Sequence, residues 1–226
     1  VENDELKKFN VILANPPYSI KSWDQKGFEN DPYGRNTWGT PPQSCADYAF
    51  QQHIQKSLHL ENGRSVTLWP HGILFRDAEA KMRRKMIEED LVECVIGLGP
   101  NLFYNSPMES CLLITKTNKS VEKKGKILII NAVKEVKLEK NIAFLEVKHI
   151  NKIFNSFKEF NNIDGFSKLV SIEEVLENKG SLNIAQYVSN VDVGNEQVSI
   201  DKALSDWINQ SEELKNSMND LFQILN

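Results

Sequence analysis

The sequence predicts an α/β fold, a sheet covered by helices, followed by a helical tail. Over the first two-thirds of the chain, short apolar runs alternate with amphipathic segments, the usual pattern of such a sheet. Beyond residue 140 the pattern changes, and from residue 204 apolar residues recur in steps of three and four. The chain has 226 residues, of which 40% are hydrophobic and 26% charged, so it is long enough for one sizeable core and has a globular composition.

An apolar run at 9–14 predicts the first strand, and it leads directly into the motif Asn15-Pro16-Pro17-Tyr18. Two consecutive prolines fix φ and remove two backbone donors, so the strand must end in a rigid turn. The motif gathers a carboxamide, carbonyl oxygens and an aromatic ring, which together suit a planar group carrying an amine, such as adenine. The alternative is ordinary turn chemistry with Tyr18 packed beneath it.

Two helices and four further strands are expected next. A loop over 19–43, rich in Gly, Pro, Asn and aromatic residues, precedes a helix that Ser44 and Asp47 are expected to cap and Gly63 to end. Asp77 is expected to cap the second helix. The strands are predicted at 65–69, 91–98, 111–114 and 126–131. On the second helix, the residues expected to point inward are Ala78, Met82 and Met86, and those expected on the solvated face are Lys81, Arg83, Arg84 and Lys85.

After residue 140 the sequence predicts more helix. Residues 171–174 have the pattern of a capping box, and a linker is expected at 191–198. One apolar helical face is predicted from Ile150, Ile153, Phe154 and Phe157.

The tail carries a narrow apolar seam of about three heptads, with Ser211 as its one polar member. One interpretation is a helix that folds onto its own domain. The other is a coiled-coil-like arm for a partner subunit, which the narrow seam favours. The apolar seam residues are Leu204, Trp207, Leu214, Met218, Leu221 and Leu225.

Composition excludes several classes of protein. The net charge of −4 and the pI near 5.7 are not those of a stand-alone nucleic-acid binder, so most phosphate contacts to any DNA substrate are expected elsewhere. The three cysteines are widely spaced, which predicts reduced thiols in a cytoplasmic protein and no metal site. No apolar run approaches membrane-spanning length, and no serine has the Gly-x-Ser-x-Gly surroundings of a hydrolase.

Several separated segments, beginning with 9–19, carry a family pattern in order along the chain. The others are Pro41-Pro42, Ala46–Phe50, Gly63–Arg64, Trp69–Arg76, Val95–Leu98, Asn101–Tyr104, Lys124–Leu128, Gly165–Ser167 and Leu182–Val188. Together they resemble the methylase (M) subunit of type I restriction–modification systems, an N6-adenine DNA methyltransferase family. Residues 105–110 depart from the Gly-rich form of that family.

The resemblance implies the C-terminal half of a doubly wound, Rossmann-like sheet that uses S-adenosylmethionine, followed by the helical tail. It divides the chain into a partial catalytic domain (1–135), an α/β extension (136–190) and a subunit-interaction tail (191–226). The Gly-rich turn that would admit the cofactor is missing, because Gly97-Leu98-Gly99 is followed by Pro100. The main cofactor pocket is therefore expected upstream of Val1, and this chain alone is expected to be inactive.

The resemblance also assigns roles to residues. Asn15 and the Pro16 carbonyl would accept the N6 hydrogens of a flipped adenine, Pro17 would hold the turn, and Tyr18 would stack on the ring. Asn15 would also face the cofactor. Phe103 is the candidate for the other face of the ring, with a core phenylalanine as the alternative. Candidate DNA contacts in the loop after the motif are Lys21, Trp23 and Arg35, with a packed surface loop as the alternative.

The expected partners are DNA, a specificity subunit and a restriction subunit, held in a hetero-oligomer through residues 200–226. Two other functions stay open. The same motif serves protein-glutamine and RNA amino-methyltransferases, whose targets are also planar amines. A non-catalytic scaffold fragment is the alternative from another class.

Overall fold

A computed structural model describes residues 5–103, 107–140, 142–189 and 200–225. The chain divides into two compact units, residues 1–190 and 191–226, and each is described by itself. The linker expected at 191–198 lies outside the described residues, as does Tyr104.

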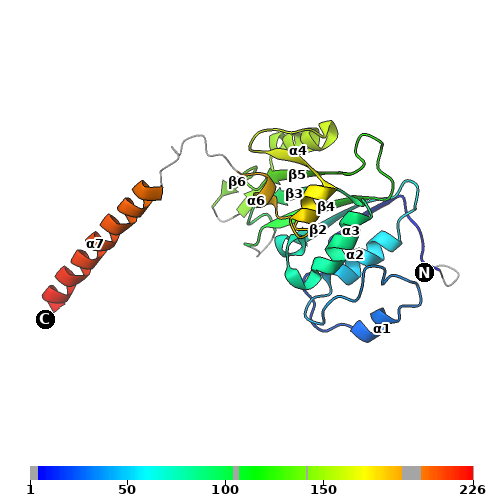
Figure 1. Cartoon of the computed structure of the whole chain (residues 1–226), viewed down its shortest axis with the longest axis horizontal. Coiled ribbons are helices and arrows are strands. Elements are labelled where there is room, and N and C mark those ends of the chain that lie inside the picture. The colour runs from blue at the N-terminus through cyan, green and yellow to red at the C-terminus, as the bar shows by residue number, and fades with distance from the viewer. Residues whose placement is uncertain (1–4, 104–106, 141, 190–199, 226) are drawn as a thin grey trace. The chain divides into compact units, whose positions relative to one another are not determined.

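The first unit contains a six-stranded mixed sheet, which confirms the predicted α/β class (Figure 1). In spatial order its strands are β1 (Val11–Ala14), β2 (Arg64–Pro70), β4 (Ser110–Lys116), β3 (Val92–Leu98), β5 (Lys126–Ala132) and β8 (Ser167–Ser171). β1 pairs with β2 and β3 pairs with β5 in parallel, whereas β4 runs antiparallel to both β2 and β3, and β8 runs antiparallel to β5. β1, β2, β3 and β5 therefore point the same way, and their carboxyl ends share one edge of the sheet.

Helices lie on both faces of the sheet. The helical segments of the first unit are α1 (Gln25–Glu29), α2 (Asp47–Lys56), the 3-10 turns η1 (His71–Leu74) and η2 (Asp77–Glu79), α3 (Ala80–Glu88), α4 (Val147–Glu159), α5 (Ile172–Glu177) and α6 (Ile184–Tyr187). β6 (Lys137–Glu139) and β7 (Ile142–Phe144) form a separate two-stranded ribbon. The segment 136–190 thus supplies β8 to the main sheet as well as α4, α5 and α6.

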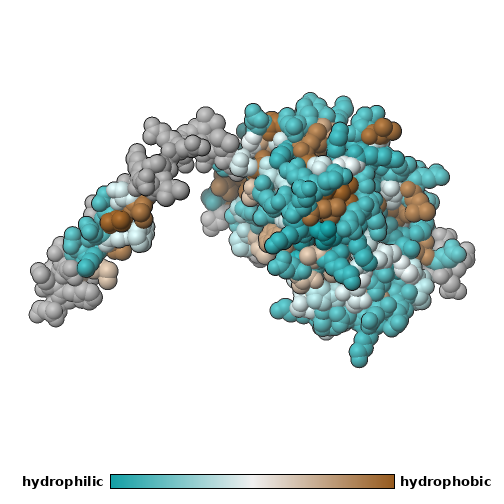
Figure 2. All heavy atoms as spheres, in the orientation of Figure 1, coloured by the Kyte–Doolittle hydropathy of each residue, from teal (hydrophilic) through white to brown (hydrophobic). Residues whose placement is uncertain are grey.

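Two apolar clusters form the core, because successive residues of a strand point to opposite faces. Trp69 of β2 packs with residues of α2, α3, α5 and α6, whereas its neighbour Leu68 joins Ile153 of α4 on the other face. This second face is only partly covered: a groove of about 390 Å³ lies between α4 and the β2–β4 part of the sheet. Figure 2 shows scattered apolar residues on an otherwise polar surface.

Both predicted helix starts were wrong. The N-cap of α2 is Ala46, and no side chain caps it, because the Asp47 carboxylate bonds to groups outside the helix. Asp77 lies in η2, and the N-cap of α3 is Glu79. Gly63 lies seven residues beyond Lys56, the last residue of α2.

The faces of α3 also differ from the prediction in two places. Met82 and Met86 point inward as expected, but Ala78 is exposed in η2. Arg83, expected on the solvated face, is buried. The capping box at 171–174 is confirmed in part, since the Ser171 hydroxyl accepts the Glu174 N–H while the Glu174 carboxylate pairs with Lys168.

The second unit contains one helix, α7 (Ile200–Leu225), as the tail pattern predicted. Leu204, Trp207, Leu214 and Met218 of the seam are exposed, and the Ser211 hydroxyl donates to the Trp207 carbonyl, 2.8 Å away. The side chains of Leu221 and Leu225 lie outside the described residues. Among the helices that the structure describes, none combines the length and the apolar character needed to cross a membrane.

Candidate active site

The Asn-Pro-Pro-Tyr motif lies at the carboxyl edge of the sheet. Asn15 directly follows β1 and is exposed, and the Tyr18 hydroxyl folds back to donate to Asn15 Oδ1 over 2.9 Å. Burial, followed by nearby Cys111 and Asp47, raises the pKa of Tyr18, so its hydroxyl stays protonated as a donor. The motif therefore places the Asn15 carboxamide beside the Tyr18 ring, with the Tyr18 hydroxyl bonded to the carboxamide oxygen.

The Tyr18 ring has a rigid support beneath it. It is half-buried and packs against Trp69, with ring centroids 6.2 Å apart and planes inclined by 45°. Trp69 is fully buried in β2, and its indole N–H donates to Gln51 Oε1 of α2 over 2.9 Å. The core of the domain thus supports one side of the Tyr18 ring.

Ser19, immediately after the motif, is held by side chains from two other segments. Its φ is +50°, a left-handed conformation that residues other than glycine rarely adopt. Its N–H donates to Asp47 Oδ1 at the start of α2 over 2.6 Å. Its hydroxyl accepts from Nη1 of Arg76, between η1 and η2, over 3.2 Å.

Arg76 is the centre of this group. Its Nη2 donates to Asp47 Oδ2 over 2.5 Å, and its Nε donates to Glu79 Oε2 over 2.7 Å. Both carboxylates are fully buried, whereas the Arg76 side chain is 29% exposed. Two buried negative charges thus share one guanidinium.

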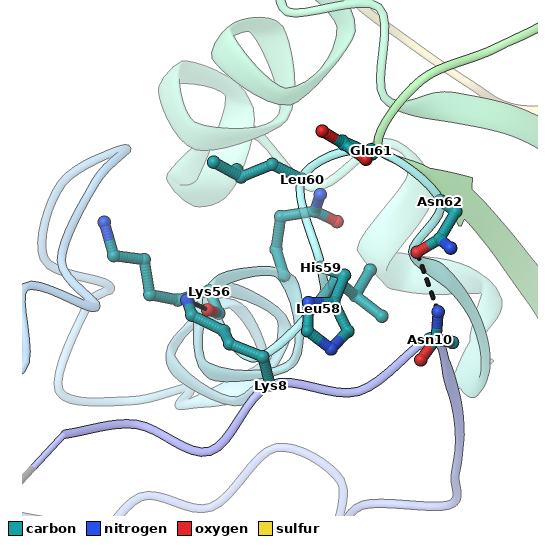
Figure 3. Close-up of a pocket in the computed structure, with 9 residues that line it drawn as sticks. Lys8, Asn10, Lys56, Leu58, His59, Leu60, Glu61 and Asn62 are labelled. Carbon is teal, nitrogen blue, oxygen red and sulfur yellow. Dashed lines mark hydrogen bonds between the residues drawn. The ribbon is translucent and has the colours of Figure 1, made fainter.

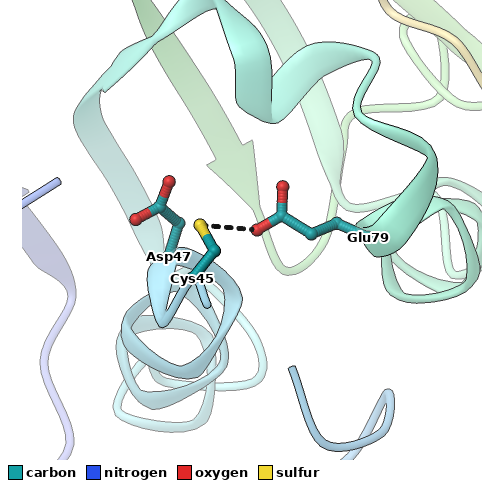
Figure 4. Close-up of side chains that lie close together, drawn as sticks. All are labelled: Cys45, Asp47 and Glu79. Atoms are coloured by element: carbon teal, nitrogen blue, oxygen red, sulfur yellow. Dashed lines mark hydrogen bonds between the residues drawn. The ribbon is translucent and has the colours of Figure 1, made fainter. Parts of the chain in front are cut away.

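Cys45 completes the cluster. Figure 4 shows its thiol pointing at Glu79, and its Sγ lies 3.4 Å from Glu79 Oε1. Burial raises the pKa of Cys45 to about 12, and burial also raises the pKa of Glu79 against the opposing effect of Arg76. Cys45, Asp47 and Glu79 are close enough together to resemble a metal-ligand set, but the guanidinium of Arg76 already contacts both carboxylates. The arrangement is a salt-bridge network.

The same edge of the sheet receives Phe103 and His71. Phe103 follows the carboxyl end of β3, is half-buried, and packs against the apolar cluster that Tyr18 also contacts. His71 follows β2, with Nε2 2.9 Å from the Ser110 carbonyl and Nδ1 3.3 Å from Glu109 Oε2. Burial lowers the pKa of His71. Phe103 and Tyr18 are thus both packed against this second apolar cluster.

The loop after the motif is more packed than its composition suggests. Arg35 pairs with Asp31 and lies over the Tyr33 ring, 5.4 Å from its centroid. Trp23 is half-buried, and its indole N–H donates to the Gln43 carbonyl over 3.2 Å. Lys21 is exposed. Of the three candidate DNA contacts, Lys21 is exposed and Trp23 is partly exposed to solvent, whereas the guanidinium of Arg35 is already paired with Asp31.

Gly97 and Gly99 serve the packing of the chain itself. A Cβ at Gly97 would lie 2.7 Å from Ile184 Cδ1, and one at Gly99 would lie 2.5 Å from the Val133 carbonyl oxygen. The glycines make room for these atoms, Gly97 within β3 and Gly99 just after it.

A pocket of about 560 Å³ lies at the other end of β1 (Figure 3). Lys8, Asn10, Lys56, His59 and Asn62 line it, and the Asn10 amide donates to Asn62 Oδ1 over 2.8 Å. Because Asn10 precedes β1 and Asn15 follows it, this pocket is separate from the motif.

Comparisons with known proteins agree on one family. Residues 2–196 match the family model of N-6 DNA methylases. The type I restriction enzyme MjaVIII methylase subunit of Methanocaldococcus jannaschii is 32% identical over 95% of this chain and 39% of its own length. The MpnII methylase subunit of Mycoplasma pneumoniae is 29% identical over 95% of this chain and 40% of its own length.

Solved structures show the same relationship. The type I restriction–modification methyltransferase subunit of Streptococcus thermophilus superimposes with a TM-score of 0.74 and 38% identity, covering 80% of this chain and 38% of that one. The EcoKI M protein shares the fold, with a TM-score of 0.61 at 18% identity over 96% of this chain and 50% of that one. This chain spans about two-fifths of the length of the curated relatives described here.

Proposed function

This chain belongs to the N-6 DNA methylase family. From that premise we propose that it forms the part of an adenine-N6 DNA methyltransferase that binds the target base, in a type I restriction–modification system. The observation that carries the proposal is the Asn-Pro-Pro-Tyr turn at the carboxyl edge of the sheet. There an exposed carboxamide lies beside an aromatic ring that the core supports. In open α/β sheets, ligands bind outside the carboxyl ends of the strands.

In the proposed mechanism an adenine is flipped out of the duplex, since its amine is unreachable inside it. Asn15 Oδ1 and the Pro16 carbonyl accept the two N6 hydrogens, which directs the nitrogen lone pair away from the ring and toward the methyl group. Pro17 holds the turn, so that both acceptors stay in place. Tyr18 stacks on the ring, a contact worth about 1–3 kcal/mol, and Phe103 is the candidate for its opposite face.

S-adenosylmethionine, when bound, supplies the methyl group. Among the residues of this chain, Asn15 fits its reactive end, because the exposed carboxamide sits at the sheet edge where the transfer would occur. Gly97 and Gly99 lie against Ile184 and Val133 of this chain, so we assign them to its own packing and not to the cofactor pocket. This chain therefore contributes to base binding and little to cofactor binding.

The proposed function also includes contacts with DNA and with a partner subunit. Lys21 and Trp23 would contact DNA beside the flipped base. The exposed seam of α7 would bind a helix of a partner subunit of the type I complex, either the specificity or the restriction subunit. As a DNA-modifying enzyme with three unpaired thiols, the protein would work in the cytoplasm.

The test is Asn15→Ala in the complete methyltransferase, assembled with its partner subunits. We expect methyl transfer from radiolabelled S-adenosylmethionine to genomic DNA from a host without adenine methylation to fall by at least about a hundredfold, because a transition-state hydrogen-bond acceptor is lost. Assembly, measured by native mass spectrometry, should stay unchanged.

Asn10→Ala is the matched control, since Asn10 is an exposed asparagine at the opposite end of the same strand. It should keep full activity. Near-normal transfer by Asn15→Ala would refute the assignment. Wild-type transfer to RNA or protein, with none to DNA, would instead support the other amino-methyltransferases that share the motif.

A further inference from the structure

Arg76 pairs with two buried carboxylates next to the Asn-Pro-Pro-Tyr motif. We propose that Asp47, Arg76 and Glu79 are positioning residues that hold Ser19 in its left-handed conformation and thereby fix Tyr18 and Asn15 for the reaction. This inference rests on the proposed function for its catalytic consequence. Its structural part stands on hydrogen bonds of this chain alone.

Ser19 has a left-handed backbone conformation, with a φ of +50°. Ser19 is one of six described non-glycine residues with a positive φ, a conformation that the surrounding structure has to hold in place. The N–H of Ser19 is engaged by Asp47 and its hydroxyl by Arg76. The carbonyl of the next residue, Ile20, accepts the Ala46 N–H over 3.2 Å. The chain leaving the motif is therefore tied to the start of α2.

Asp47 and Glu79 are both fully buried carboxylates. Burying two carboxylates is unfavourable unless each is paired and hydrogen-bonded. Asp47 is the first residue of α2 but caps nothing there, since its oxygens are used by Ser19 and Arg76. A carboxylate placed at this cost and directed at the residue after the motif is better explained by positioning than by helix capping.

Ser19 is linked to the proposed reacting atoms through Tyr18. Tyr18 precedes Ser19 directly, and its hydroxyl donates to Asn15 Oδ1. A change in the Ser19 backbone would therefore displace the Tyr18 ring from its place beside Asn15. Misplacement of reacting groups by about 1 Å can cost a hundredfold in rate. Glu79 holds the Arg76 guanidinium in place, because its carboxylate accepts a hydrogen bond from Arg76 Nε.

The experiment compares Arg76→Gln, Arg76→Lys and Asp47→Asn with the control Asp77→Asn, an exposed carboxylate next to Arg76. Amide hydrogen exchange of the peptide containing Ser19 is measured on this chain. Steady-state methyl transfer is measured on the complete enzyme with the same genomic DNA. Thermal unfolding is recorded for each variant.

We expect exchange at Ser19 to accelerate at least tenfold in Arg76→Gln and Asp47→Asn. Transfer kcat should fall tenfold to a hundredfold, while KM for DNA changes less than threefold because remote DNA contacts are intact. Arg76→Lys keeps the charge but not the fork that bonds three groups at once, so it should restore the unfolding temperature and only part of kcat. Asp77→Asn should match wild type.

Wild-type kcat in folded Arg76→Gln and Asp47→Asn would overturn the positioning role, whatever the exchange shows. Full recovery of kcat in Arg76→Lys would also overturn it, since charge neutralisation would then suffice. Unchanged exchange at Ser19 would overturn the structural route even if kcat fell. If the wild-type enzyme transfers no methyl group to DNA, the proposed function fails, and the exchange measurement still decides whether the network holds Ser19.

Discussion

At the scale of single residues, the Tyr18 hydroxyl is hydrogen-bonded to Asn15 Oδ1, the same oxygen that the proposed mechanism uses to accept a hydrogen from the substrate amine. It donates to Asn15 Oδ1 over 2.9 Å. A carboxamide oxygen has two lone pairs, so an arriving amine either takes the second or displaces the hydroxyl. The hydrogen bond thus fixes the orientation of Asn15 before any base is bound, and the ring supplies stacking afterwards.

Separating these two contributions gives a prediction for Tyr18. Tyr18→Phe keeps the ring and removes the hydroxyl, so methyl-transfer kcat/KM should stay within about fivefold of wild type, because one hydrogen bond is worth about 1 kcal/mol net. Tyr18→Ala also removes stacking, and kcat/KM should fall about ten- to a hundredfold further. Equal losses in the two variants, measured in the same assay, would mean that the hydroxyl and not the ring matters.

The sequence revealed the motif but not what holds it. Asn15, Pro16, Pro17 and Tyr18 are contiguous, and the preceding strand was predictable from an apolar run. Asp47 and Arg76 lie 28 and 57 residues from Ser19, and only the folded chain brings them together. Local patterns therefore misread Asp47 as a helix cap. The available signal was that Asp47 and Arg76 both fall within segments that carry the family resemblance.

At the scale of elements, η1, η2 and α3 deliver Arg76 to the site, and one buried residue organises them. Arg83 of α3 donates to three carbonyls, those of Gly180 over 2.8 Å, Ile73 over 3.3 Å and Arg76 over 3.0 Å. It therefore ties α3 to η1, to the segment between η1 and η2, and to the segment between α5 and α6. Charge runs usually lie in solvent, so sequence alone could not distinguish Arg83 from its neighbours.

Replacing Arg83 should be far more costly than replacing a neighbour on the same helix. Arg83→Met removes the side-chain donor of the Gly180 carbonyl, whereas the Ile73 and Arg76 carbonyls keep the Tyr48 hydroxyl and the Glu79 N–H, so the free energy of unfolding should drop by about 1–3 kcal/mol. Lys81→Met makes the same type of change at an exposed position, and its effect should be within about 0.5 kcal/mol. Urea unfolding of this chain measures both. Similar effects at the two positions would contradict the bracing role of Arg83.

At the scale of the whole molecule, the chain consists of a sheet domain and a helix without a core of its own. The alternation of strand-like and helix-like segments in the sequence predicted the sheet domain, and the seam of apolar residues predicted the helix α7. The seam residues Trp207 and Leu214 are 65% and 64% exposed, and apolar side chains are visible on α7 in Figure 2. In coiled coils such a seam is buried against a partner helix, and the partner cannot be read from this sequence.

This arrangement predicts that Leu214→Asp breaks assembly without unfolding the sheet domain. A carboxylate on the seam would have to be buried without a partner in the helix–helix contact, which is strongly unfavourable. Asn216→Asp is the matched control, because positions two residues apart lie on nearly opposite sides of a helix and Asn216 is outside the seam. Native mass spectrometry of the purified complex should show Leu214→Asp as free methylase and Asn216→Asp as intact assembly, while both keep the wild-type unfolding temperature of the sheet domain. If Leu214→Asp instead lowers that temperature and leaves assembly intact, the seam packs onto its own domain, and the partner-binding interpretation fails.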